Sequence, residues 1–404
     1  MSPPRSRPPQ ALAPQPPYRV AGAGRLLVVS AGMGAGHDTV AAELLRRVRE
    51  RGGDALVVDV LALLPYRLGG LLRLFYRGSV RHFPWVYAAL YRWFLRPGPG
   101  RRPAGTALAR LAGDRLVSLA DRSGADAVVP VFHLGAQLTG HLRSRGRLPV
   151  PSAVLVVDFV VHRQWQHPGN DLYLCLTDDA AREARGATGV PAEACGPVVA
   201  PAFRIAHGTG TTGTTGRTRT PDTPAADDWR RLFARHGPGR PPVLLSSGAW
   251  GVASRPEATV RLLAGAGFLP VVLCGDNDRL RRRLTALPGA LVLGWVTDMP
   301  GLLRAARALI DNAAGQTAAQ ALAVGLPVVG HRPIPGHGAD GVRRMAALGV
   351  SEAAEDDAAL LVALRRLTAD GPDRRARVAA GRALFRADPV ARLFGPADAA
   401  RVRR

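Results

Sequence analysis

The sequence has 404 residues, of which 47% are hydrophobic, and a formal net charge of +23 at pH 7. This length is sufficient for two domains, each with its own buried core. All of the positive charge outside histidine comes from arginine, because lysine is absent. Such a balance indicates an acidic partner, which could be a nucleic acid, an anionic membrane or a phosphorylated substrate. An Ala/Arg/Gly/Pro-rich proteome would also enrich arginine without any partner.

The sequence also argues against a membrane-spanning chain and against sites built from cysteine. No apolar run approaches the roughly 18 residues that span a bilayer, so membrane contact must be peripheral. The three cysteines, Cys175, Cys195 and Cys274, are far apart and have no C-x-x-C spacing. This argues against a disulfide framework, a cysteine zinc site or a redox pair, and the thiols are expected to be reduced.

The chain begins with a proline-rich stretch, and residues 1–24 are expected to be a disordered tail. From Arg25 onward, short apolar runs alternate with segments of helical period, which is typical of a βαβ architecture. Residues 25–204 are therefore predicted to be an N-terminal domain. Its expected strands are residues 26–29, 56–58, 127–129, 154–157 and 172–174.

The first predicted strand runs into a glycine-rich turn, residues 30–37, with a helix expected from about Asp38. Glycine permits a tight turn, and the following helix N-terminus attracts negative charge or a polar acceptor. The turn lacks the Gly-Lys-Ser/Thr ending of a P-loop. His37 stands at its mouth, where an imidazole could act as a general base or position an acceptor. The alternative is a histidine that only hydrogen bonds the backbone near the helix N-cap.

Residues 67–96 interleave arginine with eight of the 22 Phe, Tyr and Trp residues of the chain. A basic, aromatic and amphipathic segment is typical of helices that lie at a membrane surface. The alternative is a pair of core helices whose arginines face solvent. A nucleic-acid groove would use similar residues, but no nucleic-acid motif accompanies them. The predicted membrane-binding residues are Arg73, Arg77, Trp85, Arg92 and Trp93.

A second polar cluster follows the predicted strand at residues 154–157. Asp158, His162, Trp165 and His167 lie within ten residues, directly before Pro168. Strand ends face the ligand cleft in doubly wound folds, so this cluster is a candidate for the site. Metal binding is not favoured, because the two histidines need a helix to converge and Pro168 prevents its continuation.

A Gly/Thr/Pro stretch, residues 205–228, is predicted to be a flexible linker. The βα alternation resumes in residues 229–386, which are predicted to be a C-terminal domain, with strands near residues 243–245, 270–273, 291–293, 308–310 and 327–329. Residues 387–404 are expected to be a C-terminal helix or tail that can pack back on the N-terminal domain. The fold class is therefore α/β, with two doubly wound halves joined by a linker.

Two strand-to-helix turns of the second half suit a diphosphate, because small residues leave backbone N–H groups free. The first is residues 246–251, which includes Ser247 and Gly248. The second is residues 312–320, which includes Gly315, Gln316 and Thr317.

Four blocks resemble the family of monogalactosyldiacylglycerol synthases and processive diacylglycerol glucosyltransferases, which is related to the N-acetylglucosaminyl transferase of lipid II synthesis. They are S-A-G-M-G-A-G-H at residues 30–37, D-F-V-V-H-R-Q-W-Q-H-P at 158–168, G-W-V-T-D-M at 294–299, and A-L-A-V-G-L-P-V-V…I-P-G at 321–336. The resemblance implies a GT-B fold, in which two Rossmann-like domains face each other across a cleft. It further implies an acceptor- and membrane-binding N-terminal domain, a UDP-sugar-binding C-terminal domain, and inverting transfer without a bound metal.

Site roles follow from the same resemblance. His37 would lie beside the acceptor hydroxyl, Asp158 would be the base or its partner, and residues 294–296 would meet the uracil. The predicted acceptor or cleft residues are Gly34, Gly36, His133, His162 and Trp165. The predicted donor-binding residues are Ser247, Gly248, Gly275, Val296, Gly315, Gln316, Thr317, Gln320 and His337.

The chain departs from the family pattern around the donor. Ala314 and Gly315 replace a Gly-Gly pair, and Gln320 stands where an acidic residue holds the ribose diol. An amide lacks the charge assistance of a carboxylate, so we expect weaker UDP binding. His337 and Gly338 replace a Gln-Glu pair, and Gly341 replaces an asparagine, so the identity of the sugar stays open.

The sequence thus predicts a hexosyltransferase that moves a sugar from a UDP-sugar to diacylglycerol or a related lipid. The expected partners are the UDP-sugar, the lipid acceptor and an anionic membrane, with no nucleic acid, no cofactor and no metal. The expected location is cytoplasmic and peripheral, on the inner face of the cell membrane. Two alternatives remain: transfer to a soluble aglycone, and a degenerate GT-B protein that binds lipid without catalysis.

Overall fold

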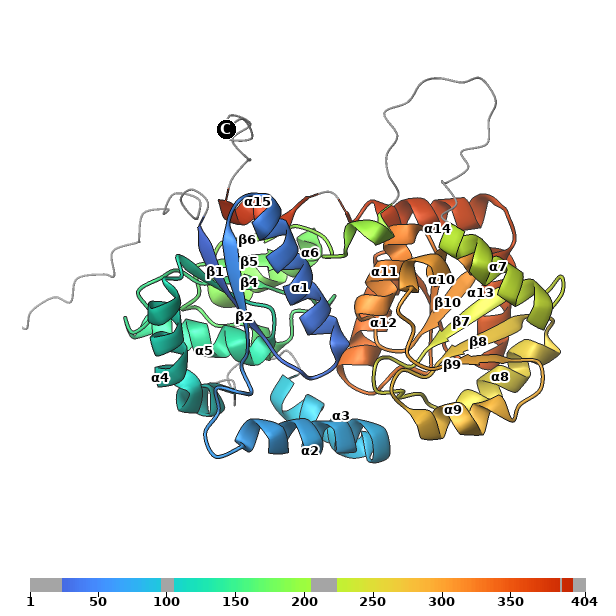
Figure 1. Ribbon diagram of the computed structural model, residues 1–404, viewed down its shortest axis with the longest axis horizontal. Helices are drawn as coiled ribbons and strands as arrows, with labels where there is room; N and C mark the ends of the chain where they lie inside the picture. Colours follow the sequence, from blue (N-terminus) through green and yellow to red (C-terminus); the bar gives the residue numbers. More distant parts are fainter. Residues whose placement is uncertain (1–23, 96–104, 205–223, 386, 395–404) are drawn as a thin grey trace, which may run out of the picture.

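The computed structural model describes residues 24–95, 105–204, 224–385 and 387–394, which form two α/β lobes lying side by side (Figure 1). The expected N-terminal tail (residues 1–24, save Gly24) and most of the expected linker lie outside the described residues, as does the C-terminal segment after Phe394. None of the helices within the described ranges is long and apolar enough to cross a membrane.

The N-terminal lobe contains two parallel three-stranded sheets, with strand orders β2-β1-β3 and β4-β5-β6. A parallel bridge between Val128 and Ser152 brings β3 alongside β4. The strands are β1 Arg25–Ser30, β2 Asp54–Asp59, β3 Ala127–Pro130, β4 Ala153–Leu155, β5 Leu172–Cys175 and β6 Ala192–Ala194. The helices are α1 Ala35–Glu50, α2 Leu68–His82, α3 Pro84–Leu90, α4 Gly105–Ser123, α5 His133–Ser144 and α6 Asp178–Thr188.

β1 explains why the strands of this lobe read as continuous apolar runs. Leu26 and Val28 belong to one buried cluster, whereas Leu27 and Val29 belong to another. Successive side chains of a strand point to opposite faces, so a strand covered on both faces must be apolar at every position.

The C-terminal lobe has a single parallel sheet of six strands, in the order β12-β11-β10-β7-β8-β9. Its strands are β7 Pro242–Ser246, β8 Leu269–Leu273, β9 Leu291–Leu293, β10 Ala308–Asp311, β11 Val328–His331 and β12 Glu352–Ala354. Its helices are α7 Pro224–His236, α8 Pro256–Gly265, α9 Asp278–Thr285, α10 Met299–Ala305, α11 Gln316–Val324, α12 His337–Ala347, α13 Asp357–Thr368 and α14 Pro372–Arg382. This is the Rossmann strand order, which reverses between β7 and β10 and opens a crevice beyond the carboxyl ends of those strands.

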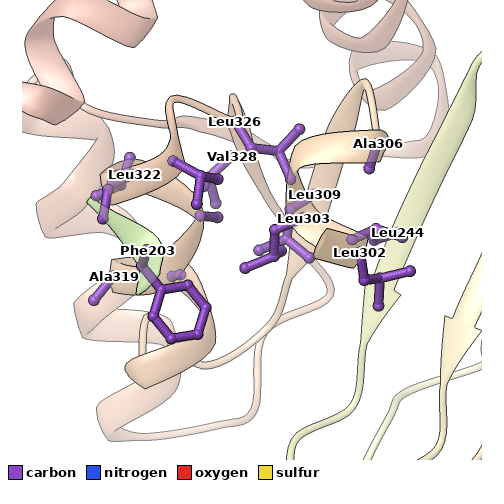
Figure 2. Close-up of a cluster of buried hydrophobic side chains, with 14 of the residues drawn as sticks. Phe203, Leu244, Leu302, Leu303, Ala306, Leu309, Ala319, Leu322, Leu326 and Val328 are labelled. Carbon is purple, nitrogen blue, oxygen red and sulfur yellow. The ribbon is translucent and has the colours of Figure 1, made fainter. Parts of the chain in front are cut away.

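A buried apolar cluster joins the two lobes. Phe203 of the short 3-10 turn Pro201–Phe203 packs beside Ala319 and Leu322 of α11 (Figure 2). Val199 belongs to the same cluster, and the Gln316 Nε2 amide donates to the Val198 carbonyl at 2.9 Å. These contacts hold the end of the N-terminal lobe against the helix that begins at the crevice.

The chain then returns to the N-terminal lobe. Val390 and Leu393 of α15 (Pro389–Phe394) are buried in the cluster that contains Leu26. Asp388 accepts hydrogen bonds from Arg47 at 3.0 Å and Arg51 at 3.1 Å. Residues 387–394 therefore cross back and close the N-terminal core.

Residues 68–95, which we call the strap, form a helical excursion between β2 and α4. It consists of α2, α3 and the π-helical turn Tyr91–Leu95. Figure 1 shows α2 and α3 beneath the junction of the two lobes, and the strap is bonded to the C-terminal lobe as described below.

Some predicted boundaries differ from the observed ones. α1 begins at Ala35 rather than near Asp38, because Gly34, with φ 118°, makes the turn directly before it. α7 begins at Pro224, so residues 224–228 are helical and not linker. The strands β6 and β12 were missed, because each has only three residues and includes a glutamate.

Candidate active site

One cavity of ≈ 340 Å³ lies between the lobes and is lined by both. His37 and Asp158 reach it from the N-terminal lobe, and Gly315 and His337 reach it from the C-terminal lobe. These residues follow strands β1, β4, β10 and β11, so the carboxyl ends of parallel strands position the lining.

Two helix N-termini meet at this cavity. α1 begins after Gly34 and α11 begins after Gly315, and all four residues from Gly34 to His37 line the space. A Cβ at Gly36 would lie 3.5 Å from the Cβ of Gln316, so the first turns of the two helices are close. Both present unpaired backbone N–H groups and a partial positive charge toward a ligand.

His37 has a fixed ring orientation. Its Nδ1 lies 2.9 Å from the carbonyl oxygen of Val131, and its ring stands edge-on to Phe132 with centroids 4.9 Å apart. A carbonyl can only accept, so Nδ1 of the neutral ring carries the hydrogen and Nε2 keeps its lone pair. The lone pair that a general base needs is therefore on Nε2, because Nδ1 is bonded to the backbone.

Asp158 is oriented by a buried indole. Trp165 is fully buried, and its Nε1–H donates to Asp158 Oδ2 at 2.8 Å. His162 Nε2 is 3.6 Å from the same oxygen, which is too long for a hydrogen bond. The carboxylate lines the cavity, so it has one oxygen held by Trp165 and remains accessible to a ligand.

The structure places three predicted acceptor residues outside the cavity lining. His133, His162 and Trp165 pack together behind Asp158, with the two imidazole centroids 5.1 Å apart. Burial lowers the pKa of His133 to about 3 and lowers the pKa of His162 well below its ordinary value. Both rings are therefore neutral near pH 7, and they pack behind Asp158, outside the cavity lining.

The donor side is built from glycines, small residues and amides. All nine predicted donor residues line the cavity. Gly275 has φ 53°, and a Cβ there would lie 2.3 Å from the carbonyl oxygen of Ala249. Among the described lining residues none is an arginine, although the chain carries 54 arginines. A bound anion would therefore be stabilised by backbone N–H groups, hydroxyls and the N-terminus of α11.

Two of the predicted departures from the family pattern, Ala314 and Gly341, lie next to one another. Ala314 adopts φ 53°, in the left-handed region that favours glycine, and its methyl group is buried. A Cβ at Gly341 would lie 2.8 Å from the Ala314 Cβ, so a side chain at position 341 would collide with this methyl group. The two substitutions are therefore sterically coupled. Asp311 supports the turn by accepting from the backbone N–H of Ala314 at 2.5 Å, and burial raises its pKa.

Sequence reasoning missed two lining residues, Tyr76 and Val80, and did not single out Trp250, Trp295 and Asn312 within the donor-side turns that it predicted. Tyr76 and Val80 lie four residues apart on the strap, which was predicted either to meet a membrane or to form core helices. The i, i+4 spacing was a usable signal, because it puts both side chains on one helical face.

The other face of the strap is exposed and apolar. Trp85 is 71% exposed and Trp93 is 65% exposed, and the other large apolar side chains exposed in the described part of the strap are Leu71, Leu74, Phe75 and Phe83. Arg77 and Arg92 are also exposed. Arg73 is also exposed, and it is ion-paired with Asp59 beside Gly32, so it braces the strap against the N-terminal lobe.

A metal site is a separate question. Among the described residues, no three or more His, Cys, Asp or Glu side chains form a group that could hold a metal ion.

Comparisons with known proteins agree with the resemblance in the sequence. Residues 37–199 match the family model "Monogalactosyldiacylglycerol (MGDG) synthase". The chain is 24% identical over 390 residues to the processive diacylglycerol beta-glucosyltransferase of Bacillus thuringiensis (strain Al Hakam), an alignment that covers 91% of each protein.

Solved structures identify the fold. The chain is similar to Acinetobacter baumannii MurG, with a TM-score of 0.52 and 13% identity over 90% of this chain and 94% of that one. It is also similar to CalG4, the calicheamicin glycosyltransferase, with a TM-score of 0.54 and 16% identity over the same shares. The predicted GT-B fold is confirmed, and so is the resemblance to the MGDG synthase family.

Proposed function

Because the chain has the GT-B fold and carries a domain of the MGDG synthase family, we propose that it transfers a hexose from a UDP-sugar to diacylglycerol or a related lipid. The relative in Bacillus thuringiensis is named for glucose transfer to diacylglycerol, and the family model is named for galactose. The product would be a glycolipid.

One observation carries the proposal: a candidate base and an anion-binding helix N-terminus face the same cavity from opposite lobes. His37 presents a free Nε2 from the N-terminal lobe, and Gly315 begins α11 on the C-terminal lobe. Glycosyl transfer needs both elements, because a hydroxyl must lose a proton while a diphosphate leaves.

The reaction can be followed atom by atom. The acceptor hydroxyl attacks the anomeric carbon from the face opposite the diphosphate, and its proton passes to His37 Nε2. The bond between the anomeric carbon and the β-phosphate oxygen breaks, and its electron pair leaves with UDP. The N–H groups of Gln316 and Thr317 stabilise the charge that grows on the diphosphate, without a bound metal. One substitution at carbon inverts the anomeric centre.

Asp158 would assist the same step. Its carboxylate is held by Trp165 and accessible from the cavity, so it can accept a hydrogen bond from the acceptor or stabilise the imidazolium of His37 as it forms. Gln320, which is nearly buried in the lining, would bond the ribose diol through its amide.

The lipid would arrive through the exposed face of the strap. The apolar side chains of this face lie outside the cavity, while Tyr76 and Val80 of the same helix line it. An amphipathic helix with apolar and arginine side chains can enter the interface of an anionic bilayer, and each arginine near such a surface adds about 1 kcal/mol. We therefore propose peripheral binding to the inner face of the cell membrane, with Arg77, Trp85, Arg92 and Trp93 in contact with lipid.

The test is transfer on vesicles that contain diacylglycerol and an anionic phospholipid, with labelled UDP-glucose, UDP-galactose or UDP-N-acetylglucosamine. We expect a labelled glycolipid from at least one donor. Co-sedimentation of the chain with these vesicles should be lost in the double variant Trp85→Ser, Trp93→Ser. The matched control is Trp229→Phe, which changes a tryptophan of α7 outside the strap.

Two outcomes would contradict the proposal. No transfer and no UDP binding would leave a degenerate GT-B protein. Transfer to a soluble aglycone by a chain that stays in the supernatant would retain the enzyme class and reject the lipid acceptor.

A further inference from the structure

The strap has a second, inward face that is aromatic and polar. Tyr87 and Tyr91 are almost fully buried, Tyr76 lines the cavity, and Arg81 donates to Asn277 Oδ1 at 2.5 Å. Asn277 belongs to the C-terminal lobe, so this face of an N-terminal excursion contacts the opposite lobe.

The contacts of this face concentrate on the donor side of the cavity. The Tyr76 ring stands edge-on to Trp250 with centroids 5.6 Å apart. The Tyr91 hydroxyl donates to Asp340 Oδ2 at 2.7 Å, and the Tyr87 hydroxyl is hydrogen-bonded to Nδ1 of His337. His337 and Asp340 both belong to the first turn of α12, so two tyrosines of the strap hold one helix N-terminus of the other lobe.

His337 occupies the part of the cavity where a transferred sugar would lie, if the proposed function holds. It lines the cavity, and it is close enough to Asp158 and His37 to interact with both electrostatically. Gly338, the next residue, packs against Asn312, directly before the turn that leads to α11. His337 is therefore near both the proposed diphosphate end and the proposed base.

The ring of His337 has one nitrogen in use and one available. Burial lowers its pKa, so the ring is neutral and has one donor and one acceptor nitrogen. Tyr87 engages Nδ1 and packs edge-on at 90° with ring centroids 5.7 Å apart. This contact fixes the rotation of the ring and leaves Nε2 for a hydroxyl of the sugar.

We propose that Tyr87 is a positioning residue for the donor sugar, which holds His337 so that Nε2 faces the sugar hydroxyls. The strap of the acceptor lobe thereby completes the sugar end of the donor site. The inference rests on the proposed function. Tyr87 itself does not line the cavity, but its ring also stands edge-on to Tyr76, a lining residue, with centroids 5.4 Å apart. The double variant with His337→Gln therefore separates an effect through His337 from one through Tyr76.

Tyr91 supplies a matched control. It is on the same inward face, is equally buried and donates its hydroxyl to the same helix, but its partner Asp340 does not line the cavity. Tyr91→Phe weakens the attachment of the strap without freeing the ring of His337. Tyr87→Phe removes one oxygen atom and keeps the aromatic packing.

The experiment measures two affinities by calorimetry, one for UDP and one for the UDP-hexose that the wild-type chain binds most tightly. The variants are Tyr87→Phe, Tyr91→Phe, His337→Gln and the double variant Tyr87→Phe, His337→Gln. We expect Tyr87→Phe to weaken UDP-hexose binding about tenfold, the value of one hydrogen bond, and to leave UDP binding within about twofold. Tyr91→Phe should change neither by more than about twofold. In the His337→Gln background, Tyr87→Phe should have no further effect.

Each contrary outcome identifies what fails. Equal losses for Tyr87→Phe and Tyr91→Phe, or equal losses of UDP and UDP-hexose, would overturn the positioning role and leave the proposed function intact. A wild-type chain that binds no UDP would overturn the proposed function and this inference together.

Discussion

The two walls of the cavity use different chemistry. The wall from the N-terminal lobe presents ionisable side chains, His37 and Asp158, each held by a specific hydrogen bond. The wall from the C-terminal lobe also carries Asp311 and His337, but around the proposed diphosphate site it presents a helix N-terminus and glycines such as Gly275, whose value lies in the backbone they expose. The first wall is suited to proton transfer and the second to holding an anion. Substitutions on the two walls should therefore alter different kinetic constants.

The largest effect is expected on the acceptor wall. His37→Ala removes the proposed base, so kcat should fall by about 10²- to 10⁴-fold, the usual contribution of general base catalysis. Affinity for UDP should stay within about twofold, because the anion site is on the other wall. Vesicle transfer gives kcat and calorimetry gives the UDP affinity.

His236→Ala is the control for this prediction, because His236 is an exposed histidine of α7. It should leave both quantities unchanged. If His37→Ala reduces UDP affinity as much as kcat, His37 has a binding role and the contrast between the walls is wrong.

The donor wall should show the opposite behaviour. Gly275→Ala places a methyl group 2.3 Å from the Ala249 carbonyl oxygen, at a φ of 53° that alanine disfavours. The turn must shift, so the free energy of unfolding should fall by about 1–3 kcal/mol. UDP affinity should fall by about tenfold or more, because Gly248 and Gly275 both line the cavity. At saturating donor, kcat should change much less than in His37→Ala.

Gly265→Ala is the matched change for Gly275→Ala. Gly265 ends α8, and a Cβ there would meet no atom within 4 Å. This variant should bind UDP normally. Normal UDP binding by Gly275→Ala as well would show that the glycine turn does not shape the donor site.

The acceptor motifs and the donor motifs could both be located from the sequence, because each follows an apolar run that forms a parallel strand. The carboxyl ends of such strands share one edge, which is where the structure places His37, Asp158, Ser247 and Gly315. Their convergence could therefore be predicted without a structure. Whether they carry the proposed roles stays a prediction.

The sequence did not show which polar side chains are buried, or which element packs against each face of a helix. His133 and His162 are polar residues near strand ends, yet the structure places them behind Asp158, with His162 buried and His133 half-buried. Sequence period shows that the strap has two faces, but both are apolar or aromatic. Which face meets the C-terminal lobe depends on the placement of residues such as Tyr87 opposite α12, more than 200 positions away in the chain.

The smallest expected effects concern the coupled departures on the donor wall. Ala314→Gly relieves the left-handed alanine conformation, which should stabilise the fold by about 1–2 kcal/mol. Two losses offset this gain: a buried methyl group is removed, and the unfolded chain gains conformational freedom at glycine. The free energy of unfolding should change by less than about 1 kcal/mol. Gly341→Ala alone should destabilise by about 1–3 kcal/mol, because the added Cβ would lie 2.8 Å from the Ala314 Cβ.

The two changes together should not add. With the methyl group at position 314 removed, Gly341→Ala meets only the Ala313 carbonyl oxygen at 3.6 Å and gains the helix propensity of alanine, about 1 kcal/mol. The sign of its effect should therefore reverse in the Ala314→Gly background. Urea unfolding of the four chains measures this coupling as a double-mutant cycle. Additive changes in the free energy of unfolding would show that positions 314 and 341 do not affect each other. The donor wall would then accommodate each residue by local relaxation, and the two residues would not be fitted to one another.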